Sequence, residues 1–335
     1  MDLTFLLAVG PPLLIVAYII KADRFPEPKG TCFLTFVAGT IIIVPAAILN
    51  DKLIPDASYA YLAGFTEETL KFLTIYFYVS RSTNFDEPMD AIVYGTLVSL
   101  GFATFELQSF DSRNVKSTVG SQIEVTAAMM ILDSYLALEK LSYHPNIDVA
   151  KAGITGWSLG GTVSLYSAWI PLIDAINDGK YRFAAHLPIY PGCLAYPYPE
   201  KSMVFSQAPV HILIGELDDW VPASACTNLL EKLDESGLSH NIDITIYKDA
   251  HHSFDREMDL ITMEKGYTLG DCFFPMSGEG ELYLSEFWNI PINTPLRQKL
   301  ALLTCAGRGP TMGGNKDAKE KSFKFSADFF IENLK

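Results

Sequence analysis

The hydrophobic positions divide the 335-residue chain into two parts with different patterns. In the first hundred residues they form four nearly continuous runs, at residues 3–20, 32–49, 59–79 and 91–105. A helix needs about 17–25 residues to cross a bilayer, which three runs provide and the fourth nearly provides. This part of the chain therefore predicts an all-α transmembrane bundle of about four spans.

From residue 121 onward the apolar stretches are shorter and of two kinds. Some carry apolar side chains at helical spacing, and others are short runs bounded by turn residues, which is typical of buried strands. Alternation of strands with helices predicts a parallel sheet with right-handed crossovers. Strands are expected at residues 152–155, 183–190, 210–214 and 242–247, and helices at residues 123–141, 162–170, 223–233 and 316–334.

Net charge and cysteine spacing argue against some classes of partner and site. The net charge of −14 argues against nucleic acid as a partner, because nucleic-acid binding requires clustered Lys and Arg. The five cysteines are widely spaced and form no C-x-x-C pair, so we expect no structural zinc site. Cys193 and Cys226 could pair in an oxidising compartment. We expect no metal, no cofactor and no protein partner.

The loop between the first two runs predicts the membrane topology. It carries Lys21, Arg24 and Lys29, the densest positive charge in this half, and the positive-inside rule places it in the cytoplasm. The first run lacks a basic leader and an A-x-A-like cleavage site, so it is expected to be a retained span. Four spans then place the second part on the extracytoplasmic, or periplasmic, side of a multi-pass membrane protein.

The third run carries charges at its centre, namely Glu67, Glu68 and Lys71. Each charge at the centre of a membrane helix costs about 2.5–3.5 kcal/mol on insertion scales, so three together need a reason. Glu67 and Lys71 are four residues apart and could form an ion pair on one helix face. That pair accounts neither for Glu68 nor for Glu106, which follows the fourth run. Carboxylates buried between adjacent helices would have raised pKa values and could activate water.

The E-E-x-x-K run, the loop at residues 86–90 and the F-x-x-x-E ending at Glu106 resemble the PrsW family of glutamic intramembrane proteases. This resemblance covers residues 1–106 and implies catalytic roles for Glu67, Glu68 and Glu106, with Lys71 in the same motif. The family continues with further spans that carry a histidine and an aspartate, whereas the apolar pattern here stops after Glu106. We therefore expect a truncated PrsW-like segment.

The second part contains the run Gly156-Trp157-Ser158-Leu159-Gly160-Gly161. A short strand precedes it and a helix follows, which is the context of a nucleophile elbow. Its glycines allow backbone to lie against backbone where Cβ atoms would collide. The turn exposes Ser158 at a helix N-terminus, and the N–H of Leu159 is placed to stabilise an oxyanion. An ordinary strand-to-helix turn is the alternative.

Two later strand ends carry suitable partners. Asp218 and Asp219 follow the strand at residues 210–214, and His251 and His252 follow the next strand. Catalytic groups gather at the carboxyl ends of parallel strands, and the order Ser, Asp, His is that of α/β-hydrolases. We assign Ser158 as nucleophile, His252 as general base and Asp218 as the group that orients it, with His251 and Asp219 as rivals.

These motifs, together with residues 186–193 and 312–315, resemble the dienelactone hydrolase family over residues 121–335. The resemblance implies an α/β-hydrolase fold and the triad roles of Asp218 and His252. Dienelactone hydrolases proper use cysteine as nucleophile, so Ser158 indicates a general carboxylester hydrolase. The family has further strands before residue 123, and one of their loops supplies an oxyanion donor. Here we expect an incomplete sheet with an unpaired edge, and the loss of that donor.

The sequence thus predicts three regions: a transmembrane PrsW-like segment at 1–106, a polar linker or junction at 107–120 and a dienelactone hydrolase-like domain at 121–335. The first hypothesis for function is a membrane-tethered serine hydrolase that cleaves a carboxylic ester or lactone. The alternatives are a glutamic intramembrane protease and an inactive fusion of two truncated genes.

Overall fold

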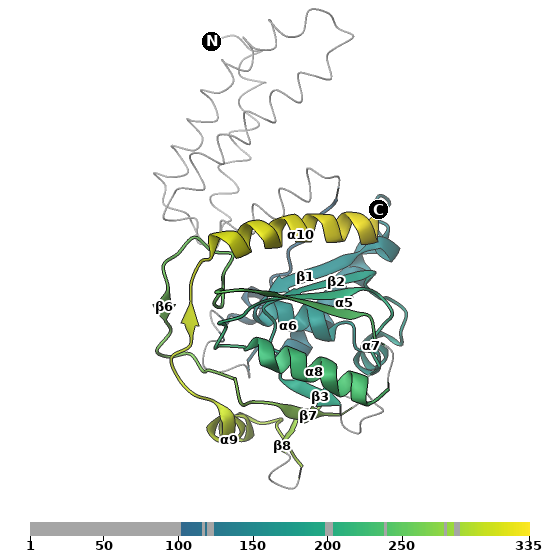
Figure 1. Ribbon diagram of the computed structural model, residues 1–335. Helices are drawn as coiled ribbons and strands as arrows, with labels where there is room; N and C mark the ends of the chain where they lie inside the picture. Colours follow the sequence, from purple (N-terminus) through teal and green to yellow (C-terminus); the bar gives the residue numbers. More distant parts are fainter. Residues whose placement is uncertain are drawn as a thin grey trace, which may run out of the picture. The chain divides into compact units, whose positions relative to one another are not determined.

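A computed structural model describes residues 102–115, 118, 124–197, 204–237, 240–277, 280–284 and 289–335 (Figure 1). Three of the four apolar runs, and with them Glu67, Glu68 and Lys71, lie outside these residues, as does most of the fourth run. Phe102 to Phe105, the end of the fourth run, are described and are not helical. Within the described part of the chain, no helix combines the length and the apolar character needed to cross a bilayer.

The centre of the described unit is a parallel sheet of four strands in the order β1-β2-β4-β5. Its hydrogen-bonded pairs confirm the parallel sheet predicted from the alternation of strands and helices. β4 and β5 form the longest ladder, from Val210 opposite Ile242 to Gly215 opposite Tyr247. The strands are β1 (Gly153–Trp157), β2 (Ala185–Ile189), β4 (Val210–Gly215) and β5 (Ile242–Tyr247).

Helices cover both faces of this sheet. Figure 1 shows α10 along one face, and α6 and α8 on the other. α5 begins at Ala127, after its N-cap Thr126, whose hydroxyl accepts from the N–H of Met129. Besides the 3-10 turns η3 (Asp111–Arg113) and η4 (Val149–Lys151), the helices around the sheet are α5 (Ala127–Leu141), α6 (Leu159–Tyr166), α7 (Ile170–Asn177), α8 (Ala223–Glu235) and α10 (Lys316–Leu334).

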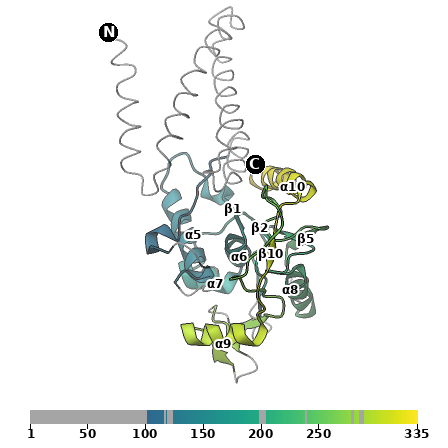
Figure 2. The same ribbon diagram turned by 90° about the vertical axis from the view of Figure 1, so that its left-hand side faces the viewer.

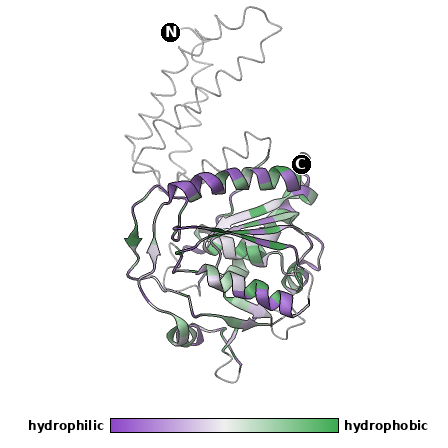
Figure 3. Cartoon of the chain, viewed as in Figure 1, coloured by the Kyte–Doolittle hydropathy of each residue, from purple (hydrophilic) through white to green (hydrophobic). Residues whose placement is uncertain are grey.

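The core lies between the sheet and these helices. All five residues of β2 are buried, and β4 is buried at every position except His211. α10 is mostly hydrophilic in Figure 3, yet its Phe329 and Phe330 are buried against the sheet. A Cβ atom at Gly153 of β1 would come within 2.6 Å of the Phe330 ring, so this strand needs glycine there for α10 to pack closely.

The polar segment predicted as a linker packs against the domain in its described part. Ser109 is buried, and the Arg113 guanidinium forms a salt bridge with Asp133 of α5 at 2.6 Å. This hydrogen-bonded guanidinium holds the pKa of the Asp133 carboxyl below its usual range. The described residues 107–115 of the predicted linker or junction therefore have partners in the domain.

β1 is an edge of the sheet among the described residues, since it pairs with β2 alone. This agrees with the prediction of an unpaired edge where a complete hydrolase sheet would continue. Its residues are half-buried or buried rather than exposed.

Residues 256–312, which we call the strap, connect the loop after β5 to α10. The strap contains short strands and one helix, and the Cys272–Cys305 disulfide closes most of it into a loop. Strand β10 pairs with β6, and β7 pairs with β3, which lies outside the strap. Figure 2 shows α9 away from the sheet, at the opposite end from α10. The elements are β3 (Ala195–Pro197), β6 (Ile261–Thr262), β7 (Phe274–Met276), β8 (Tyr283–Leu284), β9 (Ile290–Pro291), α9 (Pro295–Cys305) and β10 (Thr311–Met312).

Candidate active site

Ser158 lies in the turn between β1 and α6 with φ 53° and ψ −112°, a conformation that non-glycine residues rarely adopt. Such backbone costs on the order of 1–3 kcal/mol and persists only where its surroundings fix it. Here the Ser158 N–H donates to the carbonyl of Ile189 in β2 at 3.0 Å. The turn therefore holds the serine at the carboxyl end of the sheet, as a nucleophile elbow requires.

Two of the three glycines of the elbow are required by close approach. A Cβ at Gly156 would lie 2.6 Å from the backbone of Gly160, and one at Gly161 would lie 2.5 Å from the Ile189 carbonyl oxygen. Gly160 itself has open space where its Cβ would be. The sequence argument about backbone contact thus applies to Gly156 and Gly161 and does not apply to Gly160.

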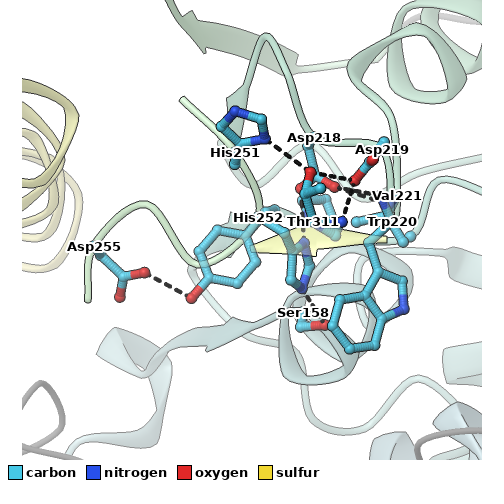
Figure 4. Close-up of polar contacts among 12 residues, drawn as sticks. Ser158, Asp218, Asp219, Trp220, Val221, His251, His252, Asp255 and Thr311 are labelled. Atoms are coloured by element: carbon cyan, nitrogen blue, oxygen red, sulfur yellow. Dashed lines mark hydrogen bonds and ion pairs between the residues drawn. The ribbon is translucent and has the colours of Figure 1, made fainter. Parts of the chain in front are cut away.

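Ser158, His252 and Asp218 form one hydrogen-bonded chain (Figure 4). Nδ1 of His252 lies 2.7 Å from Oδ2 of Asp218, and Nε2 lies 2.9 Å from Oγ of Ser158. An ionised carboxylate only accepts, so Nδ1 donates to Asp218 and Nε2 remains as an acceptor for the serine hydroxyl. The geometry therefore allows His252 to take a proton from Ser158.

Asp218 is fixed at both carboxylate oxygens. Its Oδ1 accepts from the N–H groups of Trp220 and Val221, at 3.0 and 2.9 Å, which closes a tight turn ahead of α8. The Asp218 side chain is fully buried and that of His252 is 3% exposed. The N–H groups of its own turn thus fix the orientation of the Asp218 carboxylate, whose other oxygen accepts from His252.

The rival residues have another partner, Thr311 of β10. His251 Nδ1 lies 2.9 Å from the Thr311 hydroxyl. Asp219 accepts from the N–H and the hydroxyl of the same threonine, at 2.7 and 2.9 Å. Of the four Asp–His combinations, only Asp218 with His252 forms a chain to Ser158 in the described residues.

Leu159 is the first residue of α6, directly after Ser158. A helix leaves its first N–H groups without intrahelical acceptors, so the Leu159 N–H points to the start of the helix as an available donor. This position suits an oxyanion that forms on a group bonded to Ser158. The loss of a second donor stays a prediction.

Aromatic side chains that sequence reasoning did not single out surround His252. The Tyr190 ring meets the imidazole edge-on at 4.6 Å between centroids, and the Trp220 ring lies at 5.0 Å. The Tyr190 hydroxyl donates to the buried Asp255 at 2.8 Å. Burial raises the pKa of Asp255, and burial together with that carboxylate raises the pKa of Tyr190. Tyr190 directly follows the end of β2, which is the signal that could have revealed it.

A disulfide lies beside this site. Cys193, in the loop after β2, is bonded to Cys226 of α8, and both are fully buried. The neighbouring Gly192 N–H donates to the Thr162 hydroxyl of α6 at 2.8 Å. These bonds join the loop after β2 to the helices on one face of the sheet.

The protease-like residues are not brought together in the described part of the chain. Glu106 is exposed, and its carboxylate accepts a hydrogen bond from the side chain of Gln108. Glu67, Glu68 and Lys71 lie outside the described residues, so the roles that the resemblance implies for Glu67, Glu68 and Glu106 stay a prediction. Among the described residues, no group of three or more His, Cys, Asp or Glu side chains could hold a metal ion.

Two family models match this chain. The PrsW family, described as intramembrane metalloproteases, matches residues 27–137, and the dienelactone hydrolase family matches residues 104–267. The family description thus names a metalloprotease where the sequence resemblance was to a glutamic protease. The two matched ranges overlap at residues 104–137, a stretch that contains residues 107–120 and extends past both of their ends.

Curated relatives match as well. Protease PrsW of Bacillus subtilis is 32% identical over 186 residues, which cover 52% of this chain and 79% of that protein. Protease PrsW of Geobacillus kaustophilus is 30% identical over 132 residues, which cover 37% of this chain. The chain spans 56% of the Geobacillus protein and about half of several others.

Solved structures match part of this chain. A putative dienelactone hydrolase from Klebsiella pneumoniae is 22% identical, with a TM-score of 0.30, over 38% of this chain and 51% of that one. A dienelactone hydrolase-like promiscuous phosphotriesterase from metagenomic libraries is 15% identical, with a TM-score of 0.37, over 62% of this chain and 63% of that one.

Proposed function

We propose, from the premise that this chain belongs to the PrsW protease family and also matches the dienelactone hydrolase family, that it is a membrane-tethered serine hydrolase. The observation that carries the proposal is the hydrogen-bonded chain Ser158–His252–Asp218 on a strained elbow. Its substrate is a carboxylic ester or lactone.

The reaction runs in two halves. Ser158 Oγ attacks the acyl carbon while its proton passes to Nε2 of His252, and the Leu159 N–H stabilises the oxyanion. The carbon–oxygen bond to the leaving alcohol then breaks, and His252 protonates that alcohol. Water attacks the acyl-serine and gives its proton to His252, which returns it to Ser158 as the acid leaves. Asp218 stabilises the imidazolium in both halves.

The cysteines support an extracytoplasmic position for this domain. Disulfides persist in oxidising compartments and are rare in the cytosol. The bonds Cys193–Cys226 and Cys272–Cys305 therefore agree with the topology expected from Lys21, Arg24 and Lys29. The lipid bilayer is the proposed anchor through residues 1–106.

A PrsW-like protease is the second candidate, because the curated relatives carry that name. It would use Glu67, Glu68 and Glu106, of which Glu106 is exposed and the other two lie outside the described residues. The third reading is an inactive fusion of two truncated genes.

Two assays of the full chain in detergent, hydrolysis of p-nitrophenyl butyrate and cleavage of a peptide, distinguish the three candidate functions. The proposal predicts turnover that Ser158→Ala reduces by at least about a hundredfold and Glu67→Gln leaves within about twofold. Ester turnover that survives Ser158→Ala would contradict it. Peptide cleavage that is lost in Glu67→Gln and kept in Ser158→Ala would favour the protease, and no turnover of either substrate by an intact, inserted chain would favour the fusion.

A further inference from the structure

The loop that carries His252 must reach across the sheet to meet Ser158. In the strand order β1-β2-β4-β5, Ser158 follows β1 and His252 follows β5, so two strands lie between them. The loop turns back with positive φ at Asp249 (54°) and Ser253 (59°). A loop that spans this distance needs contacts along its length that keep the His252 imidazole within hydrogen-bond distance of the Ser158 hydroxyl.

The end of β4 provides one fixed point through Asp218. The end of β2 offers another, because Tyr190 follows that strand with φ 37° and its N–H donates to Leu213 of β4 at 2.6 Å. The Tyr190 side chain is 2% exposed and fits between two residues of the histidine loop. Its ring meets His252 at 4.6 Å and Phe254 at 5.3 Å, both edge-on.

The Tyr190 hydroxyl makes a further contact with the histidine loop. It donates to Oδ1 of Asp255, a bond drawn in Figure 4, and Asp255 is 2% exposed. Hydrogen bonds to a buried carboxylate are stronger than neutral ones, and an unsatisfied carboxylate there would be costly. A single side chain from β2 thus contacts the first and last residues of the segment 252–255.

The same strand end also fixes the nucleophile. Ile189, the residue before Tyr190, accepts the hydrogen bond from the Ser158 N–H. Ile189, the last residue of β2, and Tyr190, directly after it, therefore hold the serine backbone and the histidine loop in one frame.

We propose that Tyr190 and Asp255 form a positioning pair that sets the distance and orientation of His252 relative to Ser158. The inference rests on the proposed serine hydrolase function and adds to it two residues that act through His252. The groups around the imidazole are Ser158, Asp218, Tyr190 and Trp220, and those acting on Asp255 are Tyr190, His252 and Arg256.

The test measures the rate at which a fluorophosphonate probe labels the full chain in detergent between pH 5 and pH 9. Tyr190→Phe keeps the ring and removes the hydroxyl, and we expect its labelling rate to fall about tenfold. Asp255→Asn should lower the rate similarly and shift the midpoint of the pH profile downward by about half a unit, because a negative charge near His252 is lost. The double variant should be no slower than about twofold below either single variant.

Tyr247→Phe is the matched control. This variant removes the same hydroxyl, and the Tyr247 ring also packs on Phe254, with 5.1 Å between the ring centroids. Among the described ring contacts, none joins Tyr247 to His252. It should label at the wild-type rate. Thermal unfolding of each variant shows whether it is folded, and the pH midpoint separates positioning from stability, since destabilisation alone does not move it.

Equal rates and an unchanged pH midpoint in Tyr190→Phe and Asp255→Asn, with normal labelling of the wild type, would overturn the positioning role and leave the proposed function intact. Effects that multiply in the double variant would overturn the pair as a unit. Absence of labelling in the intact wild type would overturn the proposed function, and the inference with it.

Discussion

The parallel sheet and the strap contribute to the site in different ways. The sheet strands run for five or six residues, and β2 and β4 are almost wholly buried. The strap strands run for two or three residues, and a disulfide ties their loops together. Every proposed reacting group follows a sheet strand, whereas the strap contacts residues adjacent to them and, through Met312, the backbone of His252. We therefore expect the chemistry to depend on the buried ladder, with the strap securing the loops beside it.

The contacts of the strap show this division. Thr311 bonds to Asp219 and His251, the residues adjacent in sequence to the proposed catalytic pair. The Leu269 N–H donates to the carbonyl of Trp220, and the Gly313 N–H, just after the strap, donates to the carbonyl of His252. These bonds hold backbone and neighbouring side chains, so side chains that contact the strap should matter less to the reaction than those of the triad.

The largest expected effect separates His252 from His251. His252→Ala should lower the rate of fluorophosphonate labelling by about 10²–10⁴, because the serine loses its base. His251→Ala should stay within about twofold, since its ring bonds to Thr311 rather than to the serine. Measured labelling rates of the two variants at pH 8 check this, with Asp218→Asn and Asp219→Asn as a second matched pair. A larger loss in His251→Ala would reverse the assignment.

The two disulfides sharpen the comparison because each joins cysteines 33 residues apart. Chain entropy predicts a similar loss of about 3–4 kcal/mol in the free energy of unfolding when either is removed. Cys193 adjoins Gly192, which bonds to α6, so Cys193→Ser with Cys226→Ser should also slow labelling severalfold. Cys272→Ser with Cys305→Ser should slow it less. Denaturant unfolding and labelling rates give both quantities.

An equal slowing of labelling by both disulfide variants would contradict the division between sheet and strap. It would indicate that the strap determines the geometry of the reacting groups. A loss confined to Cys272→Ser with Cys305→Ser would contradict the division more strongly.

How much of this molecule follows from its sequence depends on the range of the interactions. The proximity of Ser158, Asp218 and His252 could be predicted because each lies in the connection after a strand with a readable pattern, and parallel strands bring those ends together. The helix at Lys316–Leu334 was likewise predicted at its observed limits. Local pattern was sufficient in these places.

Longer-range features could not be predicted in the same way. The bond between Tyr190 and Asp255 joins residues 65 apart in the chain, and nothing local to either residue marks its partner. The strap strands are too short for periodicity and are held by pairing and a disulfide. The helix α9 was missed, although Thr294 caps its first turn and Pro295 begins it. Residues 107–115 looked like a linker because their partners, such as Asp133 for Arg113, lie elsewhere in the chain and leave no local pattern.

The smallest expected effect concerns a buried histidine of the sheet. His186 of β2 is 1% exposed, and burial lowers its pKa to about 4. Below pH 6.5 the unfolded chain binds a proton at this position and the folded chain does not, so stability falls as pH falls toward 4. The loss amounts to about 3 kcal/mol across this window and is absent above pH 7.

Urea unfolding of the full chain at pH 7.5 and pH 4.5 measures this loss. His186→Gln should show a weaker dependence on pH, whereas the exposed His144→Gln should behave as the wild type. A dependence unchanged by His186→Gln would show that other groups carry the acid sensitivity of the sheet.

The central claim is that Ser158 is a nucleophile activated by His252. Mass spectrometric mapping of the fluorophosphonate adduct on the full chain in membranes tests it directly. The account predicts one phosphonyl group per chain, on the peptide that contains Ser158, formed as fluoride leaves, and no adduct in Ser158→Ala. An adduct on another residue that persists in Ser158→Ala, or no adduct in an intact and inserted chain, would contradict the account.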